Sequence, residues 1–212
     1  MAGISIQIRN LQRLQRELES IDAKGKKAIE ATVKDVKKRA PSWVAQEVTN
    51  IYNIKKSEIA PSKGGKGAGS VKVEGEKITD ITITYKGRLL TPVHFGMTPK
   101  TPPQGKKYKI TMQVYKGKKK VIGRYLNTRT KGGDYSERSH NILMPTGGSG
   151  EGAVPYIPFQ RMSKDRNDVK KFVVTSVPQM VANPEASKAI IDRLNEESAK
   201  RLEHNAERFL NK

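Results

Sequence analysis

The sequence predicts an α+β fold, in which a mostly antiparallel β-sheet packs against a long N-terminal helix and a second long helix lies near the C-terminal end. Two observations lead to this prediction. Apolar residues recur at helical spacing over about 30 residues in the first quarter of the chain, and again near its end. Between these stretches, short runs of β-branched residues are separated by glycines and prolines, as in antiparallel strands and their turns. We therefore treat residues 1–212 as one domain with extended loops.

The chain opens with a predicted strand and a predicted helix. Residues 4–8 alternate apolar and polar side chains, as a half-buried strand does. Asn10 can then cap a helix, because its side chain can accept a bond from a free backbone N–H. Leucines at helical spacing extend this helix over residues 10–22.

A long helix is predicted over residues 22–51. One apolar face continues through it, with Trp43 or Val44 on that face. We expect Trp43 to anchor the core, because a buried tryptophan contributes a large apolar area. Pro41 lacks a backbone donor, so the helix should bend near residues 37–41 or divide into two helices placed end to end.

The next stretch leads into a β region. After a short helical turn at 55–59, four glycines make residues 61–70 a flexible loop. This loop lacks the Ser or Thr that follows a Gly-Lys pair in phosphate-binding loops, which excludes nucleotide hydrolysis. Residues 71–85 are rich in alternating β-branched side chains and turn around Gly75, so they predict a hairpin.

A second hairpin is predicted further along the chain. The apolar stretch 92–96 places His94 at a strand end, and residues 108–115 form a strong strand pattern. The return strand is expected at 121–126. The lysine-rich segment 116–120 forms the turn between these two strands.

The following 27 residues carry little apolar character. Residues 127–153 contain six glycines, and a loop of that length in a compact domain is either functional or ordered only by a partner. Apolar residues resume at 154–162, and residues 172–177 are a strand candidate that Pro178 ends.

The last element is a predicted helix of about 27 residues, or ~40 Å. Asn183 caps it and Pro184 takes its first position. Residues 181–212 carry six basic and six acidic groups, so the helix should serve packing or subunit contact. Its apolar stripe, which Ser198 weakens, supplies the subunit-contact candidates: Ile191, Leu194, Leu202 and Phe209.

The charge is strongly basic and unevenly distributed. The chain has 41 Lys and Arg against 21 Asp and Glu, a net charge of +20. Residues 61–140 hold 18 basic and 5 acidic groups, which favours contact with a polyanion such as DNA through its backbone; a solvated basic face is the alternative. The candidates for facing DNA are Lys106, Lys107, Lys109, Lys116, Lys118, Lys119 and Lys120.

The sequence offers no catalytic arrangement. The absence of cysteine excludes a disulfide scaffold, a Cys-based zinc site and a thiol nucleophile. His94, His140 and His204 have no partner at metal-ligand spacing. Asp134 and Ser136 share a glycine-rich stretch with His140, and such a stretch lacks the rigidity that catalysis needs. We therefore expect no enzyme activity, no cofactor and no metal.

Neither a membrane nor secretion is expected. No apolar run approaches the ~18 residues that span a bilayer, and no secretory signal opens the chain. We expect a protein that is made in the cytoplasm and used there or released with a particle.

Six short segments, in this order, are similar to a known family. They are residues 4–11, 52–59, 92–95, 115–119, 176–181 and 200–205. The chain resembles the minor tail protein Z family of tailed bacteriophages, which are tail completion proteins. Residues 127–153 depart from that pattern, because relatives carry a shorter segment there.

The resemblance implies a structural virion protein at the head-proximal end of the tail, where it completes the tail and aids head–tail joining. It further implies a ring of identical subunits, sixfold like the tail, around the DNA channel. The implied partners are tail tube or tail terminator proteins, head–tail connector proteins and the packaged DNA. A basic accessory protein that contacts the DNA backbone without sequence preference is the alternative.

Overall fold

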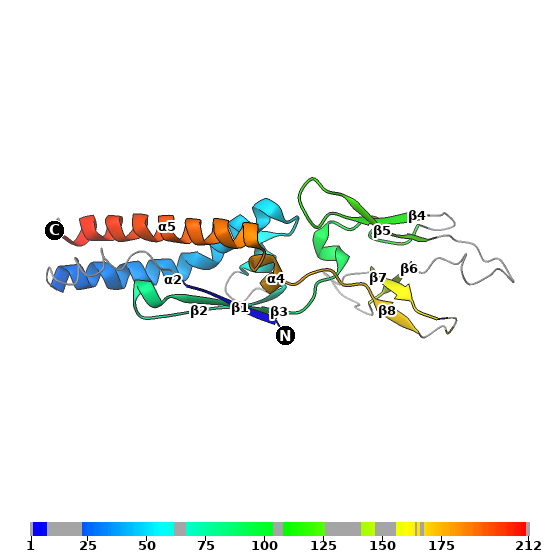
Figure 1. The fold of residues 1–212 in the computed structure, drawn as a ribbon, viewed down its shortest axis with the longest axis horizontal. Coiled ribbons are helices and arrows are strands. Elements are labelled where there is room, and N and C mark those ends of the chain that lie inside the picture. Colours follow the sequence, from blue (N-terminus) through cyan, green and yellow to red (C-terminus); the bar gives the residue numbers. More distant parts are fainter. Residues whose placement is uncertain are drawn as a thin grey trace. The chain divides into compact units, whose positions relative to one another are not determined.

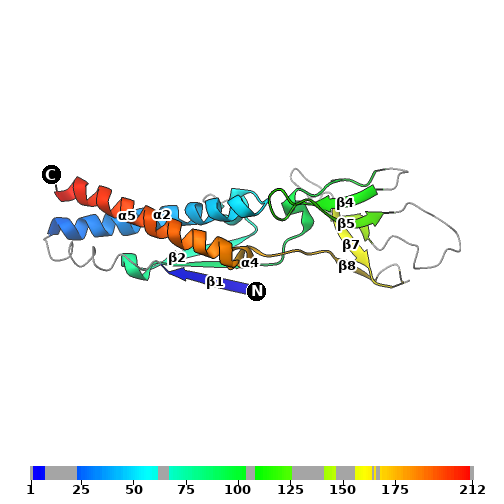
Figure 2. The same ribbon diagram turned by 45° about the horizontal axis from the view of Figure 1, so that its top comes forward.

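A computed structural model confirms the α+β fold. Helix α2 (Ala23–Ile51) and helix α5 (Pro184–Leu210) pack together and run antiparallel, and small antiparallel sheets lie between them in the sequence (Figures 1 and 2). The structure describes residues 2–7, 23–61, 67–103, 108–125, 141–146, 156–163, 165 and 168–210. The helix predicted over 10–22 lies outside them. Within the described residues, no helix combines the length and the apolar composition needed to cross a membrane.

The chain forms two compact units. The first unit contains residues 1–51, 55–88 and 176–212, and the second contains residues 52–54 and 89–175.

Helix α2 is a single helix that continues through Pro41, so the alternative of two helices is wrong. Its face towards the core is lined by small and β-branched side chains, and Val36, Ala40 and Val44 are fully buried there. Trp43 is only half-buried. The expectation that Trp43 anchors the core is therefore wrong, because its neighbour Val44 occupies the buried position.

Helix α5 begins as predicted. The Asn183 side-chain oxygen accepts hydrogen bonds from the backbone N–H groups of Glu185, at 3.1 Å, and Ala186, at 3.3 Å. Pro184 is the first helical residue. Two of the four free N–H groups at this helix end are thereby paired by the cap.

Replacing the cap gives a direct test of its contribution. Asn183→Ala is expected to lower the free energy of unfolding by ~1 kcal/mol, because two N–H groups lose their acceptor. Asn183→Asp keeps an acceptor oxygen and should be close to wild type. Urea denaturation of both variants measures the difference, and equal stabilities would contradict a role for the cap.

Buried polar groups cross between α2 and α5. The Asn205 side-chain amide donates to the Thr32 hydroxyl oxygen at 3.1 Å, and the Thr32 hydroxyl donates to the Ala28 carbonyl at 2.8 Å. Asn205 and Thr32 are both buried. Since a buried polar group without a partner is costly, this pair favours one register of the two helices over its alternatives.

The sheet of the first unit has the strand order β1–β3–β2, from β1 (Ala2–Gln7), β3 (Thr82–Gly87) and β2 (Gly69–Glu74), all antiparallel. The hairpin predicted over 71–85 is confirmed, with a short 3₁₀ helix η1 (Ile78–Asp80) in its connection. Strand β2 starts at Gly69, inside the stretch predicted as a loop. Burial raises the pKa of Tyr85, the largest core residue of β3.

Residues 172–177 are not a strand, contrary to the prediction. Strand β8 (Val169–Lys171) ends before them, and helix α4 (Val177–Val181) follows. Ser176 caps α4, because its hydroxyl oxygen accepts from the Gln179 N–H at 3.3 Å. Pro178 therefore lies in the first turn of a helix, a position where its missing N–H costs nothing.

The second unit holds two small sheets and a 3₁₀ helix. Strands β4 (Tyr108–Met112) and β5 (Lys120–Tyr125) pair, and β6 (Asn141–Pro145), β7 (Tyr156–Arg161) and β8 form a sheet in that order. Two predictions are corrected here. Strand β6 lies inside the stretch 127–153 that was expected to be a loop, and His94 lies in the 3₁₀ helix η2 (Pro92–Phe95) instead of at a strand end.

The core of the second unit joins its elements through a few apolar side chains. Met97, Ile110 and Leu143 are buried together, and half-buried hydrophobic residues surround them.

In the first unit, the predicted helical turn at 55–59 is confirmed as α3 (Lys56–Ile59).

Candidate nucleic-acid interface

The β4–β5 hairpin ends in a tight turn that has a defined backbone geometry. The Tyr115 carbonyl accepts a hydrogen bond from the Lys118 N–H at 3.1 Å. Gly117 has φ = 76°, which is the conformation that a type II turn requires at this position and that favours glycine. The turn therefore presents the side chains of Lys116 and Lys118 from a closed backbone loop.

Backbone hydrogen bonds hold β4, and the segment between β4 and the turn, against other parts of the second unit. Val114 accepts from the Asn53 N–H at 2.8 Å, and Gln113 donates to the Phe95 carbonyl at 3.0 Å. Thr98 and Thr111 exchange two further backbone bonds of 2.9 and 2.8 Å. Together these bonds fix the segment that carries the lysine-rich turn within the second unit.

The described lysines of this hairpin are all exposed. They are Lys109, Lys116, Lys118, Lys119 and Lys120; Lys106 and Lys107 lie outside the described residues. The ammonium groups of these five have no hydrogen-bond or ion-pair partner within the part of the chain that the structure describes. They are therefore available to an external anion.

The composition of the second unit adds to this positive charge. In sequence, the second unit has 17 basic and 5 acidic residues, a net charge of +12, against +8 for the first unit. The second unit therefore carries the stronger attraction for a polyanion.

An exposed aromatic residue beside the turn was not among the predicted site residues. Tyr115 is 43% exposed, and its ring packs against that of buried Tyr52 with centroids 4.9 Å apart and planes at 31°. The ring is thus held in place next to the lysines. The sequence shows that Tyr115 directly precedes Lys-Gly-Lys. It does not show that the Tyr115 ring packs against Tyr52.

The predicted subunit-contact residues of α5 fall into two groups. Leu194 and Leu202 are 1% and 2% exposed and are part of the chain's own core, so they are not available to a neighbouring subunit. Ile191 is 41% exposed. Phe209 is half-buried, and the Arg208 guanidinium lies 5.4 Å from the centre of its ring.

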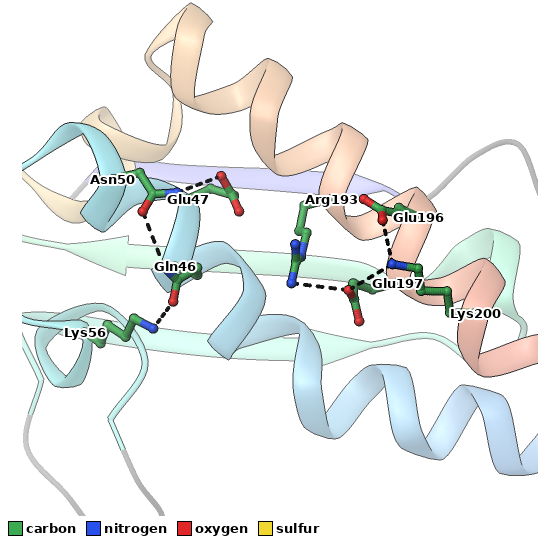
Figure 3. Close-up of polar contacts among 8 residues, drawn as sticks. All are labelled: Gln46, Glu47, Asn50, Lys56, Arg193, Glu196, Glu197 and Lys200. Carbon is green, nitrogen blue, oxygen red and sulfur yellow. Dashed lines mark hydrogen bonds and ion pairs between the residues drawn. The ribbon is translucent and has the colours of Figure 1, made fainter. Parts of the chain in front are cut away.

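Charged side chains on α5 pair with one another (Figure 3). Arg193 bonds Glu197 at 3.2 Å, and Lys200 bonds Glu196 at 2.6 Å and approaches Glu197 at 3.8 Å. The hydrogen bond from Lys200 lowers the pKa of Glu196, and the same bond raises the pKa of Lys200. Glu196 and Lys200 are both exposed, so the ion pair between them contributes little to stability.

A second polar cluster lies where α2 ends (Figure 3). Lys56 donates to the Gln46 side-chain oxygen, and the Gln46 amide donates to Asn50 at 3.3 Å. Asn50 in turn donates to Glu47 at 3.2 Å. These contacts join α3 to α2 at exposed positions.

A metal site is not found in the described part of the chain, where no three His, Asp or Glu side chains come together. The residues Asp134, Ser136 and His140 lie outside that part. Comparisons of the chain with protein-family models, with curated proteins and with solved structures found no match.

Proposed function

We propose that this chain is a structural subunit of a bacteriophage tail. It lies at the head-proximal end, completes the tail and aids its joining to the head. Copies of the chain assemble as a ring, sixfold like the tail, around the DNA channel. Tail tube or tail terminator proteins and head–tail connector proteins are its neighbours, and the chain carries out no catalysis.

The observation that carries the DNA contact is the set of exposed lysines on the β4–β5 hairpin, whose ammonium groups have no partner within the described residues. Five exposed ammonium groups from one hairpin give a local positive charge. Attraction to phosphates without readout of bases suits DNA that must still slide past the contact. The order of the six family-like sequence segments supports the place in the tail.

A second candidate function is a basic accessory protein that binds nucleic acid as a monomer. The exposed ring of Tyr115 beside Lys116 and Lys118 favours it, because an aromatic ring flanked by cations is a common platform for single-stranded nucleic acid. This candidate needs no contact between copies.

Analysis of purified particles separates the two functions. We expect the chain in tails of the phage that encodes it, at about six copies per tail, when the protein content is quantified by mass spectrometry against the tail tube subunit. Absence from particles, together with tight DNA binding by the monomer and a steep salt dependence, would contradict the tail function and support the accessory protein.

A further inference from the structure

The outer face of α5 carries a stripe of carboxylates, although the whole chain is strongly basic. The stripe consists of Glu185, Asp192, Glu196, Glu203 and Glu207, all exposed. Their spacing alternates between seven and four residues. At 3.6 residues per turn, these positions fall within an arc of about 60°. The buried residues of α5 lie on the opposite side of the helix. Lys188 and Lys200 border the stripe, and Lys200 pairs with Glu196.

The first half of α2 carries a matching stripe of lysines. Lys27, Lys34 and Lys38 are exposed, and their spacing of seven and then four residues keeps them within an arc of about 40°. Their ammonium groups have no partner among the described residues. They therefore form a basic face on the same unit that carries the acidic stripe.

An open pocket of about 580 Å³ lies along this basic face. Its lining consists of Glu30, Val33, Lys34, Lys37, Lys38, Gly75 and Glu76. The Lys37 ammonium donates to the Gly75 carbonyl at 3.0 Å. This bond ties the turn after β2 to α2. Lys34 and Lys38 thus stand at the edge of a recess that can receive side chains of another molecule.

The two faces fit each other but do not meet within one chain. Both are exposed, and α2 and α5 pack through other sides. Steps of seven and four residues correspond to about 10.5 and 6 Å along each helix axis, so cations on one helix can lie opposite carboxylates on the other. Only a second copy can bring them together.

We propose that the lysine face of α2 in one copy binds the carboxylate face of α5 in the next. Such a contact joins two different faces, so it is heterologous and generates a closed ring when the rotation between copies closes. The inference rests on the proposed function, because it names the faces through which the ring subunits meet. Exposed ion pairs are individually weak and are screened by salt, and their main effect is to set partner orientation.

Charge reversal on each face tests the contact with the full chain. One variant is Lys27→Glu, Lys34→Glu and Lys38→Glu, and the other is Asp192→Lys, Glu203→Lys and Glu207→Lys. Sedimentation velocity at 50 and 500 mM salt measures self-association, and circular dichroism verifies that each variant is folded. We expect association of the wild type at low salt, a dissociation constant raised at least tenfold in each variant alone, and recovery in the equimolar mixture, where every junction again joins opposite charges.

A control variant changes the same amount of charge elsewhere. Lys100→Glu, Lys170→Glu and Lys171→Glu replace exposed lysines of the second unit and should associate like wild type. Failure of the mixture to associate would overturn the contact. Association of either variant alone at wild-type strength would also overturn this contact. That result would still be compatible with a ring whose subunits meet through other faces. A wild-type chain that stays monomeric at low salt overturns it as well, and the copy number in particles then decides the ring separately.

Discussion

Replacing Lys118, Lys119 and Lys120 with glutamine is expected to weaken binding to duplex DNA by up to ~500-fold at about 0.1 M salt. Each contact with a phosphate contributes about 0.9 to the slope of log K against log salt concentration, so three lost contacts lower that slope by up to about 2.7. Fluorescence anisotropy titrations at several salt concentrations measure both quantities. In the phage, the variant should assemble tails but show impaired DNA retention or infectivity.

The control for this prediction removes the same charge from positions of the second unit that lie outside the β4–β5 hairpin. Lys100→Gln, Lys170→Gln and Lys171→Gln lower the net charge equally at exposed positions, and they should change the slope far less. If both triple variants lose the same affinity, the attraction comes from the overall charge and not from the hairpin turn. Normal infectivity of the first variant would refute a role of the turn in DNA contact.

Ile190→Ala is expected to destabilise the protein by ~2–5 kcal/mol, whereas Ile191→Ala should change stability by less than about 1 kcal/mol. Ile190 is 0% exposed, so its truncation leaves a cavity in the core. Ile191 is 41% exposed, and surface truncations usually have small effects. The two variants remove the same atoms at adjacent positions, so each serves as the control for the other.

Urea denaturation measures both free energies of unfolding. Equal destabilisation by the two substitutions would contradict the orientation of α5. A large effect of Ile191→Ala on assembly, with unchanged stability, would instead place Ile191 in a contact between subunits.

The orientation of α5 shows where sequence reasoning fell short. The apolar pattern placed Ile191 on the apolar stripe as a candidate for subunit contact, did not include Ile190, and marked Ser198 as a weak point of that stripe. In the structure, Ile190 takes the buried position, and Ser198 and Asn205 are buried as well. The Ser198 hydroxyl has no hydrogen-bond partner among the described residues. Asn205 can occupy its core position because Thr32, on another element, pairs with it. A single helix does not reveal that partner.

Long-range pairing explains the other differences. Strand β6 lies in a glycine-rich stretch with a weak strand pattern. It is a strand because its residues pair with those of β7. The Tyr52 and Tyr115 rings stack, and beside them the Asn53 N–H donates to the Val114 carbonyl. Both depend on contacts between residues far apart in the chain, which local propensity does not encode.

The lysine-rich turn was predictable, because it depends on short-range features. Two strand patterns flank Gly117, and glycine permits the positive φ that the turn needs. Lysine side chains in such a turn are exposed wherever the hairpin lies. The lysines of this turn are exposed, and their ammonium groups have no partner within the described residues; their contact with DNA stays a proposal.

Local sequence thus determined the two long helices, the Asn183 cap, both hairpins and the basic turn, since each follows from periodicity, capping or turn chemistry within a few residues. Only the tertiary structure decided which side of each helix is buried, that Val44 replaces Trp43 in the core, and that the carboxylates of α5 and the lysines of α2 both remain on the surface. The physical reason is that the burial of a side chain depends on which elements pack against each other. The packing energy comes from contacts between residues that are distant in the chain.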